Sequence, residues 1–250
     1  MMAIDRFAWS NRWRDWHPAE KLLPAFGLLL AAILLPPLTT APLILLVASL
    51  ALVGGAGVPS RALLAFMAPP AAFLLAGAPF LALSLDLREG LALRFSPQGA
   101  ELALAATLRA LAASICLALV TLTTPVADWA SLLRRARVPP AVIELILLVY
   151  QLIFGFVERA STGQRAQAAR LGYGRFDRGV RSLGLLVSAL FQRGLARAHR
   201  LEIGLAARGY RGELRVLRAE PPLSRRRLAA ALAGVGSTAL AGEWLARALS

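Results

Sequence analysis

The chain contains few charged residues and almost none of the residues from which metal and redox sites are built. Only 17% of its 250 residues are charged, and it has one cysteine and two histidines. A soluble domain carries about 25% charged residues, so the composition argues against an ordinary soluble protein. Cys116 has no second cysteine with which to form a disulfide or a metal cluster, and neither His17 nor His199 has a second strong metal ligand nearby. We therefore expect this chain to bind no metal and no cofactor.

Acidic residues and lysine are scarce as well. The 14 acidic residues are outnumbered by 28 basic ones, which gives a net charge of +14, and Lys21 is the single lysine. A nucleotide-binding P-loop requires a lysine at the end of a glycine-rich loop, whereas Lys21 follows Ala19 and Glu20. The sequence thus excludes a P-loop nucleotide site.

Hydrophobic residues, by contrast, make up 58% of the chain, and its mean hydropathy is +0.62. Four apolar runs precede Pro125, at about 22–35, 42–53, 62–85 and 101–123. A membrane-spanning helix needs about 20 residues, so the first two runs are tilted short spans, a re-entrant hairpin or one span broken by its prolines. We predict a membrane domain over residues 22–124 with about four transmembrane helices, behind a cytoplasmic N-terminal segment at 1–21. Arg109 lies inside the fourth run and either has a function there or reaches for the membrane surface.

The composition changes at Pro125. Residues 125–227 contain 19 arginines and seven acidic residues, and membrane proteins keep such basic segments in the cytoplasm. We predict that this region is a cytoplasmic domain, with a surface helix at 125–137 and a long amphipathic helix of about 46 Å at 177–207. The expected fold class is therefore all-α, with multi-spanning membrane helices plus long amphipathic cytoplasmic helices.

The run 141–157 is apolar enough to cross the membrane, but two observations count against a crossing. Glu144, Gln151 and Glu158 recur every seven residues and make one helix face polar. A crossing would also put the basic residues before and after the run on opposite sides of the membrane. We predict that this run does not cross and that residues 228–250 form a last transmembrane helix. The N-terminus then lies inside and the C-terminus outside.

A short motif occurs twice, each time where a long cytoplasmic helix is expected to end. Ala168-Ala169-Arg170-Leu171-Gly172-Tyr173 is followed 38 residues later by Ala206-Ala207-Arg208-Gly209-Tyr210. Glycine can form a left-handed C-terminal cap and arginine complements the helix dipole, so capping alone explains one copy. Two copies favour a binding role, because the small residues let a partner approach a planar guanidinium closely. The predicted binding residues are Ala169, Arg170, Leu171, Ala207, Arg208 and Gly209.

On these residues the chain resembles the transmembrane T component of energy-coupling factor (ECF) transporters, in particular the cobalt-transport family CbiQ. Residues 4–12 and 17–22 are similar to the opening of CbiQ proteins, and residues 206–213 resemble the end of their second cytoplasmic helix. The first copy of the motif departs from Ala-Arg-Gly at Leu171, a position at which the family varies.

The resemblance implies a non-catalytic, multi-pass scaffold in an importer of the bacterial inner membrane. Such a scaffold joins a substrate-binding membrane subunit to a dimer of cytoplasmic ATPases, and Arg170 and Arg208 would insert into grooves of the two ATPase subunits. In the cobalt subtype the partners would be the ATPase CbiO and the membrane proteins CbiM and CbiN. The resemblance leaves open a T component for nickel or for a vitamin.

Two other classes remain as alternatives. A membrane-embedded lipid-modifying enzyme needs convergent acid/base groups, but the acidic residues are dispersed along the sequence. They include Asp86, Glu89, Asp128 and Glu144. A membrane-anchored nucleic-acid binder needs aromatic residues interleaved with the basic ones, and these are too sparse for a stacking platform.

Overall fold

The computed structural model describes residues 3–86, 92–210 and 221–249. The chain forms two compact units, one of residues 2–129 together with 220–250 and the other of residues 130–219. The larger unit contains α1 (Ala3–Ser10), α2 (Pro18–Leu34), α3 (Pro37–Leu50), the π-helical turn η1 (Ala51–Gly55), α4 (Ser60–Ala82), β1 (Leu83–Asp86), β2 (Ala92–Phe95), α5 (Pro97–Thr123) and α9 (Arg225–Leu249). Helix α6 (Val126–Arg135) begins in this unit and leads into the smaller one.

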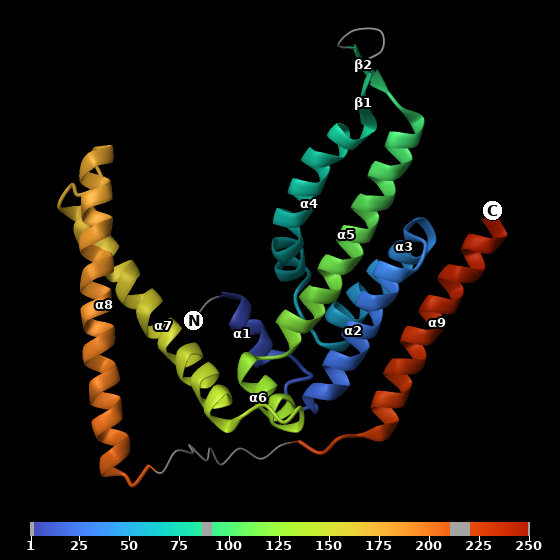
Figure 1. The fold of residues 1–250 in the computed structure, drawn as a ribbon. Coiled ribbons are helices and arrows are strands. Elements are labelled where there is room, and N and C mark those ends of the chain that lie inside the picture. Colours follow the sequence, from blue (N-terminus) through green and yellow to red (C-terminus); the bar gives the residue numbers. More distant parts are fainter. Residues whose placement is uncertain (1–2, 87–91, 211–220, 250) are drawn as a thin grey trace. The chain divides into compact units, whose positions relative to one another are not determined.

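Helix α5 forms the centre of the larger unit (Figure 1). Helices α2, α3 and α4 pack against it, and α9 packs against α2 and α3. Small residues on α5, such as Ala112 and Cys116, are almost completely buried. Small residues let helices approach closely in a membrane. Helices α9 and α3 also approach each other closely at a small residue, because a Cβ added to Gly242 of α9 would lie 2.5 Å from Oγ1 of Thr40 on α3.

Five helices in the described part of the chain are long and apolar enough to cross a membrane. They are Pro37–Gly55, Ser60–Leu81, Pro97–Thr123, Pro140–Ala169 and Arg225–Ala248. Large apolar side chains point outward from them, and Phe73 and Phe80 on α4 are 78% and 80% exposed. Such an apolar surface is stable in lipid and not in water. The predicted all-α membrane fold is confirmed.

The first two apolar runs belong to longer helices than the sequence indicated. Helix α2 begins at Pro18, and α3 begins at Pro37 and continues through η1 to Gly55. Both helices have proline in their first turn, where a backbone N–H would have no hydrogen-bond partner within the helix, so the N–H that proline lacks is not needed. The π-helical turn brings Gly55 against Trp13, since a Cβ on this glycine would lie 2.5 Å from Cζ2 of the indole.

The third run ends earlier than the predicted span of 62–85. Helix α4 stops at Ala82, and β1 then pairs antiparallel with β2. Asp86 is the last residue of β1, and Glu89 lies outside the described residues. Periodicity could not reveal this hairpin, because a short apolar run looks the same in a buried helix and in a strand.

Arg109 has a structural role that the sequence did not suggest. It lies near the middle of α5 and donates a hydrogen bond from Nη2 to the carbonyl of Leu35, 3.3 Å away. Leu35 is the C-cap residue of α2, and the last carbonyls of a helix lack partners within it. A guanidinium at this end satisfies one carbonyl and complements the helix dipole.

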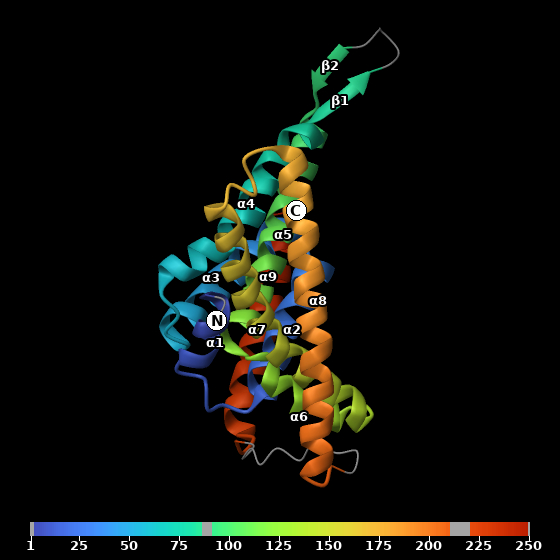
Figure 2. The same cartoon turned by 90° about the vertical axis from the view of Figure 1, so that its left-hand side faces the viewer.

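The smaller unit is an antiparallel pair of long helices, α7 (Pro140–Ala169) and α8 (Phe176–Ala207) (Figure 1). Figure 2 shows from the side that α8 is one uninterrupted helix. It matches the helix predicted at 177–207 to within one residue. The predicted run 141–157 is part of α7, which continues beyond it to Ala169.

Two glycines set the spacing of α7 and α8. A Cβ on Gly163 of α7 would lie 2.5 Å from Cδ1 of Leu186, and a Cβ on Gly194 of α8 would lie 2.7 Å from Cζ of Phe156. A large side chain of each helix therefore sits over a glycine of the other. This reciprocal contact fixes the antiparallel register.

Candidate functional site

The first candidate site is the C-terminal end of α7. The helix ends at Ala169, and Arg170 is its C-cap residue. The backbone N–H groups of Leu171 and Gly172 donate back to carbonyls of the last turn, at 3.0 and 2.9 Å. This pair of bonds is a Schellman motif, which satisfies helix carbonyls that would otherwise lack partners. Arg170 is thus held on a closed, well-defined helix end.

The second candidate site, at the end of α8, has the same geometry. The helix ends at Ala207, and Arg208 is its C-cap residue. The N–H groups of Gly209 and Tyr210 both donate to carbonyls of the last turn at 3.0 Å. In both copies Ala-Ala-Arg therefore occupies the last two helical positions and the cap.

The departure at Leu171 does not change the backbone. Leu171 follows the cap with φ 57°, and Gly209 occupies the equivalent place with φ 75°. A left-handed conformation costs an L-residue other than glycine about 1–2 kcal/mol. Leu171 is nevertheless 72% exposed, so burial of its side chain within the described structure does not offset this cost. Backbone strain at an exposed position is typical of binding sites.

A hydrogen-bond network ties the end of α7 to α8. The Tyr173 hydroxyl donates to Oε1 of Gln167 at 2.7 Å, and Nε2 of the same glutamine donates to the carbonyl of Ser182 at 2.9 Å. The Ser182 hydroxyl in turn donates to the carbonyl of Gly172 at 2.9 Å. The turn that follows Arg170 is therefore fixed from both helices.

The end of α8 is tied back to α7 by another tyrosine. The Tyr210 hydroxyl donates to Oε2 of Glu144 at 2.8 Å. This hydrogen bond raises the pKa of the Tyr210 phenol, so the hydroxyl remains a donor at neutral pH. Sequence reasoning missed this contact, because the two residues lie far apart in the chain. The Gly-Tyr pair shared by both copies of the motif singles out Tyr210 but does not identify Glu144 as its partner.

The two arginines lie at opposite ends of the antiparallel pair. Helices α7 and α8 contain 30 and 32 residues, and a rise of about 1.5 Å per residue separates the two ends by on the order of 45 Å. Arg170 and Arg208 are both exposed, and the ion pairs of the described residues do not include either of them. The unit therefore presents two widely separated cationic helix ends, each preceded by exposed alanines.

No group of three or more metal-binding side chains comes together within residues 3–86, 92–210 and 221–249. His17 is buried at the start of α2, where its Nδ1 accepts a hydrogen bond from the N–H of Ala19 at 3.1 Å. His199 lies on the exposed surface of α8 with Nδ1 3.8 Å from Oε2 of Glu202. Neither histidine is placed to share a ligand sphere.

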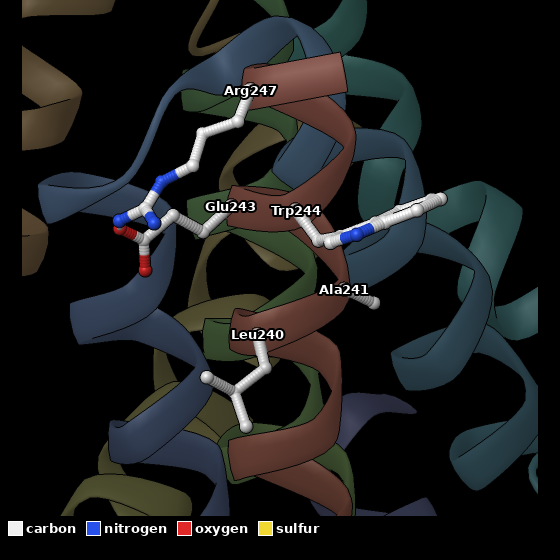
Figure 3. A pocket seen from close by; sticks show the side chains of 5 residues that line it. All are labelled: Leu240, Ala241, Glu243, Trp244 and Arg247. Carbon is white, nitrogen blue, oxygen red and sulfur yellow. Dashed lines mark hydrogen bonds and ion pairs between the residues drawn. The ribbon is translucent and has the colours of Figure 1, made fainter.

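A shallow pocket beside α9 has no converging polar groups (Figure 3). Arg247 pairs with Glu243 at 2.6 Å, and Trp244 points away from this pair. The remaining lining residues, Leu240 and Ala241, come from the same helix. Ligand sites are usually concave and place several polar groups around one point, which this surface does not.

The fold defines an integral membrane protein, and its smaller unit presents an exposed arginine at each end of a pair of long helices. Comparisons with known proteins identify the family. The family model described as cobalt transport protein CbiQ matches residues 10–217. The chain therefore belongs to the CbiQ family of cobalt transport proteins, which confirms the resemblance seen in the sequence.

Individual relatives agree with this assignment. The chain is 40% identical over 222 residues to the cobalt transport protein CbiQ of Rhodobacter capsulatus, covering 89% of this chain and 90% of that protein. It is 28% identical over 231 residues to CbiQ of Salmonella typhimurium, covering 85% and 99%. A shorter match, 36% over 112 residues, covers 45% of this chain and 19% of a protein from Methanocorpusculum labreanum named as a fused cobalt transport protein, CbiMQ.

Proposed function

We propose that the chain is the T component of an ECF-type importer for cobalt ions. It is a scaffold without catalytic activity of its own, and it couples ATP hydrolysis by a separate ATPase dimer to movement of a substrate-binding membrane subunit. The observation that carries this proposal is the pair of matching helix ends at Arg170 and Arg208. One helix end suits each subunit of an ATPase dimer, and Ala169, Leu171, Ala207 and Gly209 shape the contact around the arginines.

The partners follow from the family and from the sequence. Because the chain has no P-loop lysine, ATP is bound by another protein, a CbiO-like ATPase. The fusion of a related segment in a protein named CbiMQ supports a CbiM-like membrane subunit as a neighbour, and a small CbiN-like subunit completes the cobalt subtype. The same scaffold geometry would serve nickel or a vitamin, so the transported substrate is tested directly below.

The proposed location is the bacterial inner membrane, with the N-terminus and residues 125–227 in the cytoplasm. The packing of α7 on α8 supports this topology. If α7 crossed the membrane, α8 would accompany it, and each arginine at the bilayer centre costs about 2.5–3.5 kcal/mol. The arginines within α8 are Arg178, Arg181, Arg193, Arg197 and Arg200. We therefore assign α7 to the cytoplasmic domain although its composition alone permits a crossing.

The proposal is tested by reversing both charges, in Arg170→Glu/Arg208→Glu. Losing a charged contact at a protein interface costs about 2–5 kcal/mol, so the ATPase should bind at least about 30-fold more weakly. The complete transporter is expressed with its partners, and the measurements are co-purification of the ATPase and uptake of radioactive Co²⁺ and Ni²⁺. We expect both ATPase binding and Co²⁺ uptake to be lost while the variant still inserts into the membrane.

The matched control reverses two other exposed arginines on the same helices, in Arg159→Glu/Arg200→Glu. This control changes the net charge equally but leaves the helix ends intact, and it should retain ATPase binding. Normal Co²⁺ uptake by the helix-end variant would refute the proposal. Uptake of Ni²⁺ in preference to Co²⁺ by the unaltered transporter would overturn the cobalt assignment alone.

A further inference from the structure

The chain passes between its two units twice, and in the larger unit described residues near both passages contact the same N-terminal segment. The first passage lies between Trp129 and Ala130, and the second lies between residues 219 and 220. In the larger unit, the residues next to these passages form ion pairs with Arg14 and Glu20. We call Arg14–Asp128 and Glu20–Arg227 the anchor pairs.

The first anchor pair holds the start of α6, just before the chain leaves the larger unit. Nη1 of Arg14 lies 3.1 Å from Oδ2 of Asp128, whose side chain is only 7% exposed. Asp128 lies in the first turn of α6, where a negative charge also complements the helix dipole. The Arg14 guanidinium is further held over the ring of Trp9 at 4.4 Å.

The second anchor pair holds the start of α9, just after the chain returns. Oε1 of Glu20 accepts a hydrogen bond from the backbone N–H of Ser224 at 2.6 Å. Its Oε2 lies 3.4 Å from Nε of Arg227, and the Glu20 side chain is 1% exposed. Arg227 also lies 4.8 Å over the ring of Trp16. A carboxylate at this buried position is stable because it meets a helix N-terminus and a guanidinium together.

The segment that carries both anchors is itself rigid. Trp13 and Trp16, which flank Arg14 in the sequence, stack with their ring centroids 5.0 Å apart. Nζ of Lys21, a buried residue, donates to the carbonyls of Trp13 and Thr123 at 2.9 and 3.3 Å. Asn11 donates to the same Thr123 carbonyl at 3.3 Å. The N-terminal segment is thus attached to the end of α5, at the centre of the larger unit.

We propose that the anchor pairs are positioning residues that fix both attachment points of the smaller unit while an external force moves it. The inference rests on the proposed coupling function. Packed helices move as bodies about a few residues at element ends, and a force that passes along the chain from Arg170 or Arg208 is transmitted to the larger unit if that chain is held. When an anchor pair is broken, the chain next to it can move, and part of the movement of the smaller unit is then not transmitted to the larger unit.

The test measures how many Co²⁺ ions are taken up per ATP hydrolysed by the complete transporter in proteoliposomes. Asp128→Asn and Glu20→Gln each remove one charge of an anchor pair. We expect the ratio of Co²⁺ taken up to ATP hydrolysed to fall at least about fivefold. Coupling between two sites in a protein typically amounts to a factor of about 5 to 150, and the expected fall is the lower end of this range. Co-purification of the ATPase should be unchanged, because the helix ends are intact.

Two further variants separate positioning from simple stability. Asp128→Glu keeps the negative charge of the first anchor pair at the start of α6 and should retain most of the ratio, even if Asp128→Asn folds poorly. Glu243→Gln breaks the exposed Arg247–Glu243 pair on α9, which lies away from both passages, and should leave the ratio unchanged.

Three results would overturn the inference. They are an unchanged ratio in both Asp128→Asn and Glu20→Gln, an equal fall in Glu243→Gln, and a ratio in Asp128→Glu as low as that in Asp128→Asn. A failure of the proposed function looks different, since it appears as retained ATPase binding and uptake in Arg170→Glu/Arg208→Glu.

Discussion

Leu171 is the one position of the first motif copy at which the residue type differs from Ala-Arg-Gly while the backbone conformation is the same. The motif suggests that glycine belongs after the arginine, and Gly209 fulfils this expectation in the second copy. In the first copy a leucine adopts the same left-handed conformation, with φ 57°, and its side chain is exposed. An apolar side chain that is held in a strained conformation at an exposed helix end suits a contact with a partner.

We predict that Leu171→Gly does not destabilise the protein but lowers Co²⁺ uptake. Relief of about 1–2 kcal/mol of strain exceeds the cost of about 0.5–1 kcal/mol from the greater freedom of glycine in the unfolded chain. The melting temperature in detergent should stay the same or rise by up to about 4 °C. The converse change, Gly209→Leu, should lower it by a similar amount. A lower melting temperature for Leu171→Gly would contradict the strain argument.

At the scale of elements, α7 and α8 depend on close approach at two glycines. Gly194 lies under Phe156, whereas Gly184 of the same helix has nothing within 4 Å of the position of a Cβ. Gly194→Ala therefore adds a methyl group at a crowded position, and Gly184→Ala adds the same group at an open one. Alanine is a better helix former than glycine by about 0.8–1.0 kcal/mol, so only the packing distinguishes them.

We predict that Gly194→Ala separates the two helices and that Gly184→Ala does not. The added methyl group would lie 2.7 Å from Cζ of Phe156, which forces the ring or the helix to move. Spin labels at Arg159→Cys on α7 and Arg193→Cys on α8, in a Cys116→Ala background, report the interhelical distance by pulsed electron resonance. The distance distribution should broaden and lengthen for Gly194→Ala only. Identical distributions in the two variants would show that the ring adapts without moving the helix.

The element ends were predictable, and the contacts between elements were not. The ends of α7 and α8 follow from local chemistry, because a left-handed residue closes the last turn of a helix and an arginine there complements the helix dipole. The hydrogen bond from Tyr210 to Glu144 joins residues 66 positions apart, and periodicity within one helix carries no information about such a partner. The hairpin of β1 and β2 was missed for a related reason, since a short apolar run does not distinguish strand from helix.

At the scale of the whole molecule, the charges along the sequence lead us to predict a membrane region and a basic region that meet at residues 124 and 228. The chain changes compact unit at 129–130 and 219–220, and the assignment of these regions to membrane and cytoplasm stays a prediction. The polar residues of the segment 1–21 looked like a simple cytoplasmic segment that leads into the membrane. Their role in holding α5, α6 and α9 depends on partners more than 100 residues away, which one sequence cannot show.

The topology of the molecule gives the last prediction. A reporter that is active only outside the cytoplasm should be inactive when it is fused after Val157 or after Arg227. It should be active when it is fused after Phe95 or after Ser250. Val157 and Arg227 follow basic segments that the positive-inside rule retains in the cytoplasm, whereas Phe95 and Ser250 follow α4 and α9, which are candidate spans. An outside signal at these two positions also requires that α2, which has 17 residues, crosses the membrane. A reporter active only inside should give the opposite pattern and thereby control for expression. An outside signal after Val157 together with an inside signal after Arg227 would mean that α7 and α8 both cross, which requires the arginines of α8 to enter the bilayer at about 2.5–3.5 kcal/mol each. That cost is the physical reason to expect the cytoplasmic result.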